Sequence, residues 1–187
     1  MYRSSPWRIS VPELTEPPHS ITTAQKMLRA SRILSIPIYA TTQNRGALGP
    51  TCAELGLDTD YPTRAHVDKT AFSMYVPDLV AALPSEPQEV VIVGIEAHIC
   101  VTQTTLDLLA RGHKVYVLAD GVSSCNQEEV PIALRRLARE GAVVTTSESF
   151  LYELMGDAGI GEFKAIAGLV KEGKGSTREV LQALCKI

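Results

Sequence analysis

Cys100 is the residue of this chain best placed to do chemistry, because of the two elements that flank it in the sequence. Val90–Gly94 is an apolar, mostly β-branched run, typical of a buried parallel strand, and the segment from Cys100 to Gly112 has the pattern of a helix that ends on glycine. A thiol between a strand end and a helix N-terminus lies where open α/β sheets bind ligands, and the helix dipole favours its thiolate form. Spacing alone leaves an alternative, a buried and inert cysteine that packs as a small hydrophobic side chain.

The elements that must position this thiol follow a simple alternation. From Ser20 onward, short β runs alternate with helical patterns, which predicts βαβ units around a parallel sheet. We therefore expect an α/β fold, a three-layer α/β/α sandwich with a mainly parallel, Rossmann-like sheet. The expected strands are residues 36–42, 90–94, 114–120 and 142–146, and residues 64–74 are expected to form a short strand that runs into a turn. Two pairs with capping-box spacing predict helix starts: Thr22 with Gln25, and Asn126 with Glu129.

The N-terminal segment differs from the rest of the chain. Residues 1–19 carry four prolines and show neither strand nor helix periodicity. We expect an irregular, proline-rich arm over residues 1–19, followed by one α/β domain over residues 20–187.

Composition narrows the class of protein. The formal net charge is −3 and basic residues are scattered, which argues against nucleic-acid and membrane partners. The four cysteines form no CxxC motif, so we expect a reducing, cytoplasmic location. No glycine-rich phosphate fingerprint follows any strand, which disfavours a nucleotide-binding Rossmann protein.

Four segments, in order along the chain, carry a resemblance to a known family. They are KTAFSM (69–74), GIEAHICV (94–101), VLADGVSS (117–124) and TTSESFLYELMGDA (145–158). Together they resemble the isochorismatase-like cysteine hydrolases, in particular the subgroup of isochorismatase domain-containing proteins. The similarity covers about residues 20–172.

The resemblance implies a mechanism. In that family an Asp–Lys–Cys triad cleaves small amide, carbamoyl or related bonds through a thioester, so Cys100 would be the nucleophile and Lys69 its cationic neighbour. The family's non-proline cis peptide would fall at Ile95–Glu96, where it would aim the backbone N–H groups of Glu96 and Cys100 at an oxyanion.

Further expectations concern the surroundings of the reaction centre. Gln43, Phe72 and His98 are candidate pocket residues. The resemblance also implies a small-molecule substrate and a homo-oligomer. The Asp/His/His metal cluster of nicotinamidases has no counterpart with matching spacing around His19 and His66, so we expect no metal and no cofactor.

One member of the triad has no counterpart. The family's general base is an Asp at the end of an apolar first strand, usually as D-x-Q, whereas residues 1–19 contain only Glu13 and Glu16 as acids. The Asp-bearing strand is therefore missing or replaced. Asp58, Asp60 and Asp68 do not occupy the strand-end position, and Glu13 is the candidate substitute base.

This gap leaves two functions open. The first is a working cysteine hydrolase. The alternative is a catalytically impaired relative with a binding or oligomeric role, or an isoform with an altered N-terminus.

Overall fold

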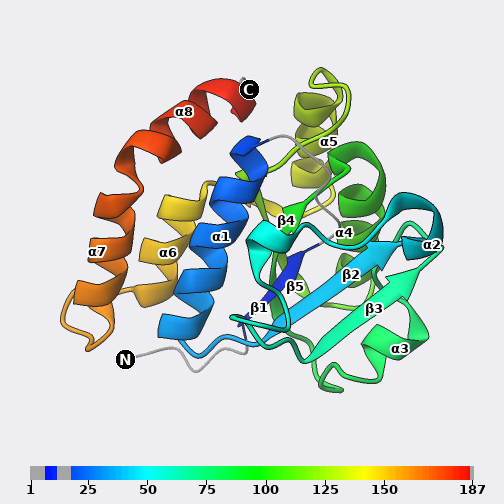
Figure 1. Cartoon of the computed structure of the whole chain (residues 1–187), viewed down its shortest axis with the longest axis horizontal. Helices are drawn as coiled ribbons and strands as arrows, with labels where there is room; N and C mark the ends of the chain where they lie inside the picture. The colour runs from blue at the N-terminus through cyan, green and yellow to red at the C-terminus, as the bar shows by residue number, and fades with distance from the viewer. Residues whose placement is uncertain (1–6, 12–17, 186–187) are drawn as a thin grey trace.

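The computed structural model of the chain describes residues 7–11 and 18–185, and it contains a six-stranded sheet between two layers of helices (Figure 1). The strands are β1 (Trp7–Val11), β2 (Ile38–Gln43), β3 (Ala65–Lys69), β4 (Glu89–Gly94), β5 (Lys114–Val122) and β6 (Val143–Thr145). Their order is β3-β2-β1-β4-β5-β6, and every neighbouring pair is parallel. The expected fold class is confirmed.

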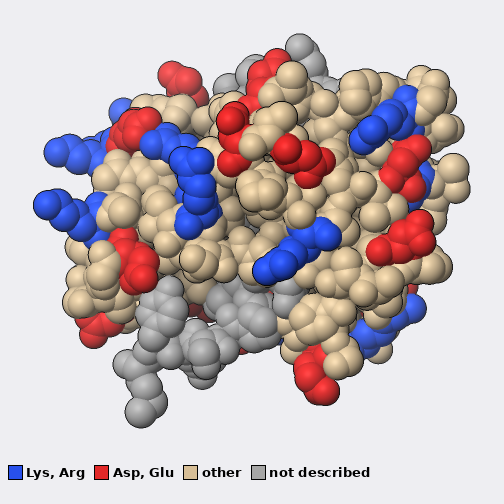
Figure 2. Space-filling model, turned by 60° about the horizontal axis from the view of Figure 1, so that its bottom comes forward, with Lys and Arg blue, Asp and Glu red and all other residues tan. Residues whose placement is uncertain are grey.

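Helices and single turns connect these strands. They are α1 (Pro18–Ile33), α2 (Arg45–Leu48), the 3₁₀ turn η1 (Ala53–Leu55), α3 (Pro77–Val80), the π-helical turn η2 (Ala97–Val101), α4 (Thr102–Leu109), α5 (Glu129–Arg139), α6 (Ser147–Met155), α7 (Phe163–Glu172) and α8 (Lys174–Leu184). Among the described helices, none combines the length and the apolar character that a membrane span requires. On the face drawn in Figure 2, acidic and basic side chains are interspersed.

Strand β1 corrects the expectation of an irregular arm over residues 1–19. Its central residue, Ile9, pairs in register with Ile38 of β2 and with Val91 of β4, so β1 occupies the middle of the sheet. The first strand is thus replaced rather than missing. Its sequence, WRISV, alternates apolar and polar residues, whereas a strand buried on both faces is usually a continuous apolar run. Because of this alternation and the prolines on either side, the sequence did not predict the strand.

The chain order creates a crevice at the centre of this sheet. From β1 the chain builds outward through β2 and β3, then returns to the other side of β1 with β4 and continues through β5 and β6. Ligand sites in such sheets lie outside the carboxyl ends of the strands at this reversal point. The fold therefore directs attention to the residues that follow β1 and β4.

Side-chain alternation on the strands divides the core into two layers. Val91 of β4 packs with α1, α6 and α7 on one face, while its neighbour Ile92 packs with α4 and α5 on the other. Figure 1 shows α1, α6, α7 and α8 gathered on the same side of the sheet. A smaller cluster of Tyr39, Met74 and Leu79 joins α3 to the β2–β3 edge.

Both capping-box predictions were wrong. α1 begins at Pro18, so Thr22 and Gln25 lie within the helix, and the Gln25 side chain instead donates to the Glu54 carbonyl at 2.8 Å. α5 begins at Glu129 without a side-chain cap. Prolines allow the earlier start of α1, because the first turn of a helix does not use their missing N–H.

Candidate functional site

Cys100 lies where the sequence predicted, after the carboxyl end of β4 and at the start of a helical segment. Its side chain is buried, with 8% of the residue exposed. β4 ends at Gly94, whose φ of 135° is a conformation that side-chain-bearing residues rarely adopt. One residue further on, the Ile95–Glu96 peptide bond is cis, which confirms the position that the resemblance implied. Turn η2 then leads directly into α4, so Cys100 belongs to the first turn of one continuous helical segment.

The end of β5 supports the loop that carries this cysteine. The Ala97 N–H donates to the Ser123 carbonyl at 2.9 Å and is also 3.1 Å from the Ser124 hydroxyl oxygen. Within the loop, the Glu96 carbonyl accepts the N–H of Val101 at 3.1 Å. The backbone before Cys100 is therefore fixed by the neighbouring strand as well as by its own turn.

Lys69 is a buried cation at the same edge of the sheet. It ends β3 beside its register partner Gln43, and its ammonium donates to the Gln43 side-chain oxygen at 2.5 Å. Two carbonyl oxygens, of Ala71 and Phe72, accept from the same ammonium at 3.0 Å each. With 6% of the residue exposed, this positive charge is held by oxygen atoms from two segments.

The loop after Lys69 connects this cation to the helix that follows Cys100. The Met74 N–H donates to the Thr104 hydroxyl at 2.9 Å, and Thr104 lies about one helical turn beyond Cys100. Met74 is buried in the core, whereas 51% of Phe72 is exposed. Of the predicted pocket residues, Gln43 thus contacts Lys69 directly, and Phe72 contributes its carbonyl to Lys69 while its side chain faces outward.

His98 belongs to a polar group formed by the Cys100 loop and the loop after β5. Its Nδ1 lies 3.0 Å from the Ser124 hydroxyl and 3.8 Å from a carboxylate oxygen of Glu96. That same carboxylate accepts the Cys125 N–H at 2.7 Å. The sequence indicated His98 but did not predict that the Glu96 carboxylate and Cys125 lie beside it. The loop after β5 contacts the Cys100 loop only in the folded chain.

The acids near Lys69 in sequence are engaged elsewhere. Asp68 accepts from the Thr42 hydroxyl and the Arg45 N–H, and these hydrogen bonds lower its pKa. Partial burial opposes ionisation of Asp58, but hydrogen bonds from Thr63 and His66 outweigh it and lower the pKa of that carboxyl. Glu13, the candidate substitute base, lies outside the described residues.

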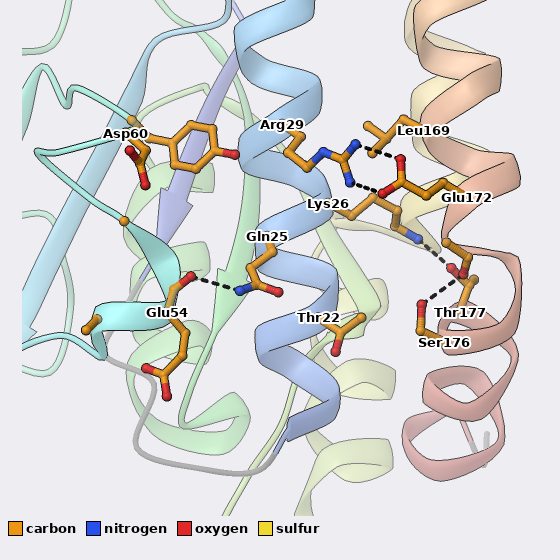
Figure 3. A pocket seen from close by; sticks show the side chains of 14 residues that line it. Thr22, Gln25, Lys26, Arg29, Glu54, Asp60, Leu169, Glu172, Ser176 and Thr177 are labelled. Atoms are coloured by element: carbon orange, nitrogen blue, oxygen red, sulfur yellow. Dashed lines mark hydrogen bonds and ion pairs between the residues drawn. The ribbon is translucent and has the colours of Figure 1, made fainter.

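A polar cavity of about 450 Å³ lies between α1, η1 and the helices α7 and α8, and the candidate site residues do not line it (Figure 3). Arg29 forms a two-pronged ion pair with Glu172, at 2.9 and 2.8 Å. The Lys26 ammonium donates to the Thr177 hydroxyl at 3.1 Å. Burial lowers the pKa of Lys26, although Asp120, 3.9 Å away, opposes this effect.

Asp120 plays the structural part that turn chemistry predicts. It is fully buried, and its carboxylate accepts the backbone N–H of Ser147 at 2.8 Å and the hydroxyl of the same residue. The carboxylate thereby fixes the first turn of α6 against the end of β5.

Comparison with known proteins gives consistent matches. The family model described as the isochorismatase domain matches residues 10–149. Isochorismatase domain-containing protein 2 of Macaca fascicularis is 43% identical over 157 residues, which are 83% of this chain and 74% of that protein. Isochorismatase domain-containing protein 1 of Salmo salar is 42% identical over 81% of this chain, but the match spans only 53% of that longer protein.

Solved structures agree. A structure titled as the MAR1 ribonuclease of Caenorhabditis elegans has a TM-score of 0.83 and 37% sequence identity, and the match covers 90% of this chain and 92% of that one. The YcaC protein of Escherichia coli, titled an octameric hydrolase of unknown specificity, shares the fold with a TM-score of 0.78 at 17% identity, over 94% of this chain and 92% of that one.

Proposed function

The chain belongs to the isochorismatase family, and from that premise we propose that it is a hydrolase that cleaves a small amide or carbamoyl bond through a thioester on Cys100. The position of Cys100 carries the proposal. Its thiol lies at the start of a helical segment, beyond the carboxyl end of a central strand, and the buried cation Lys69 ends another strand at the same sheet edge. A helix N-terminus and a nearby ammonium are features that commonly accompany a cysteine nucleophile in enzymes.

The reaction would proceed in two steps. The Cys100 sulfur bonds to the carbonyl carbon, the carbon–nitrogen bond breaks, and the thiol proton leaves with the amine. Water then cleaves the carbon–sulfur bond, yielding the acid and restoring the thiol. The N–H groups of Glu96 and Cys100 are the proposed donors to the oxyanion of each step, a contribution typically worth about 3 kcal/mol per donor.

The proposal is tested with a panel of small primary amides and carbamoyl compounds. We expect Cys100→Ala to abolish turnover and Lys69→Met to lower kcat/KM at least about a hundredfold, since each removes a group required for nucleophilic attack. Cys185→Ala and the exposed-site variant Lys164→Met are the matched controls. Mass spectrometry of the quenched reaction should find the acyl group on Cys100. Full turnover by Cys100→Ala would overturn the proposal.

For the general base we propose Glu13, which follows β1 by two residues. Glu13→Gln should lower the rate by about 10²–10⁴, while Glu16→Gln should leave it unchanged. Equal rates for both variants would exclude Glu13.

An impaired relative is the second candidate, favoured by the complete lack of aspartate before Asp58. The double variant Pro12→Asp/Leu14→Gln places a D-x-Q sequence directly after β1. If the chain lacks only its base, this variant should gain activity by about 10²–10⁴ over the parent chain. If the parent chain is active and the double variant is no more active, the chain is not catalytically impaired by the lack of this Asp.

We propose three properties of the setting. The first is that the substrate is a small molecule. The related C. elegans structure is titled a ribonuclease, so the panel includes an RNA oligonucleotide, which we expect to remain uncleaved.

The second is that the protein is a homo-oligomer, so light scattering should give a multiple of 20.2 kDa. The location is cytoplasmic, supported by four free thiols. Cell fractionation tests this, and the Phytophthora sojae relative is titled as secreted.

A further inference from the structure

Three side chains of types that bind metal ions lie close together beside the Cys100 loop. The proposed hydrolysis requires none of the three side chains. Glu96 and His98 come from the loop and turn that lead to Cys100, and Cys125 follows the end of β5. One ligand atom from each residue lies within 4.8 Å of the other two. We call this group the Glu96–His98–Cys125 cluster.

Existing contacts already fix most of the cluster. The Cys125 N–H donates to one Glu96 carboxylate oxygen at 2.7 Å, which leaves a second oxygen on the same carboxylate for another partner. The His98 ring is oriented by Ser124, whose hydroxyl lies 3.0 Å from Nδ1. The Glu96 and His98 side chains are about three-quarters buried, whereas Cys125 is exposed, so an ion can reach the cluster from solvent.

The donor set selects the kind of ion. Mg²⁺ and Ca²⁺ prefer shells made of oxygen atoms, whereas an imidazole nitrogen, a thiolate sulfur and a carboxylate oxygen suit Zn²⁺. In a tetrahedral zinc site with bond lengths of about 2.0–2.3 Å, ligand atoms are roughly 3.3–3.8 Å apart. The cluster needs only a small closing movement to reach this spacing.

We propose that Glu96, His98 and Cys125 bind a single Zn²⁺ ion, with the fourth coordination position open to water. The ion would join the loop before Cys100 to the loop after β5 through coordinate bonds. The site is separate from the reaction centre in its donor atoms, since the proposed chemistry uses the Glu96 backbone N–H and not its carboxylate.

Cobalt titration of the full chain tests this site without reference to hydrolysis. Co²⁺ replaces Zn²⁺ in such sites, and a thiolate ligand gives a near-ultraviolet charge-transfer band. We expect the band in the parent chain, its loss in Cys125→Ser, and at least a tenfold higher Kd in His98→Gln and in Glu96→Gln. Cys185→Ser is the matched control and should keep the band. Addition of Zn²⁺ should bleach the band and raise Tm in the parent chain and in Cys185→Ser, but should leave the Tm of Cys125→Ser unchanged.

Two results would overturn the site. One is the absence of a charge-transfer band in the parent chain at millimolar Co²⁺. The other is a band that survives in Cys125→Ser but disappears in Cys100→Ser, which would make Cys100 the thiolate ligand. Because Cys125 is exposed, its serine variant should fold, and circular dichroism checks this directly.

Discussion

At the scale of single residues, the four cysteines differ in how far they are exposed to solvent. Cys100 is buried at a helix start, Cys125 is exposed, and Cys52 and Cys185 are partly buried. Burial raises the pKa of Cys185 to about 11, with Asp120 adding to the effect. Burial and the nearby Glu54 also raise the pKa of Cys52. These two thiols are therefore suited to be internal references for reactivity.

We expect iodoacetamide to modify Cys100 at least tenfold faster than Cys52 or Cys185 at pH 8. A thiol with a pKa of about 11 is only about one-thousandth thiolate at that pH, and the thiolate is the reactive form. The Cys185 rate should rise about tenfold per pH unit until it levels off near pH 11. Peptide mass spectrometry on a Cys125→Ser background measures each site, and equal rates for Cys100 and Cys185 would refute the nucleophile assignment.

Asp120 lends itself to a stability test. Asp120→Ala removes the carboxylate that accepts two hydrogen bonds from Ser147 and faces the Lys26 ammonium at 3.9 Å. Loss of these hydrogen bonds and of the negative charge nearest to the buried Lys26 ammonium should lower the free energy of unfolding by about 3 kcal/mol. Asp107→Ala is the control, because its ion pair with Arg111 is exposed and should cost no more than about 0.5 kcal/mol. Urea unfolding compares them, and equal losses would contradict the structural role of Asp120.

At the scale of elements, features within one contiguous segment could be predicted from the sequence, whereas contacts between distant segments could not. The family resemblance allowed the loop from Gly94 to Cys100 to be predicted down to its cis peptide bond, since its residues are contiguous and characteristic of that family. The hydrogen bond from Lys69 to Gln43 could not, because it depends on the register of β2 against β3. The cavity between α1 and α8 was equally out of reach, since residues about 150 positions apart form it.

Two glycines provide a matched test of packing between elements. A Cβ on Gly121 of β5 would lie 2.7 Å from Val93 of β4 and 3.2 Å from Thr23 of α1, so Gly121→Ala should cost about 1–3 kcal/mol. Gly168 lies within α7, and apart from its chain neighbours and the backbone of its own helix no atom lies within 4 Å of such a Cβ. Gly168→Ala should therefore stabilise the protein by about 0.5–1 kcal/mol, through helix propensity. Opposite shifts in Tm are the expected result, and shifts of the same sign would contradict this packing.

At the scale of the whole molecule, β1 joins two halves of one sheet. β2 and β3 lie on one side of it, and β4, β5 and β6 lie on the other. Without β1, the facing edges of β2 and β4 would present unpaired backbone groups in the middle of the protein. The short strand therefore matters for the cooperativity of folding far more than its length would imply.

Ile9→Pro tests that dependence. Proline removes a backbone donor from a strand paired on both sides, which should cost about 3 kcal/mol or more, whereas Ile9→Val keeps the donor and should cost about 1 kcal/mol. The single tryptophan, Trp7, lies in β1, so its fluorescence reports on this strand while circular dichroism reports on the helices. If Ile9→Pro unfolds with the stability of the parent chain, and if its fluorescence and circular dichroism transitions coincide, β1 is dispensable for the fold.

The central place of β1 has a consequence for synthesis on the ribosome. Ile9 pairs with Val91, about 80 residues later in the chain. At roughly 5–20 residues per second, translation separates the two strands by about 4–16 s. During that interval the nascent chain can pair β1 with β2 but has no β4 to complete the middle of the sheet. A slowly translated stretch before residue 89 would prolong the exposure of that open edge, and with it the time available for chaperones to bind.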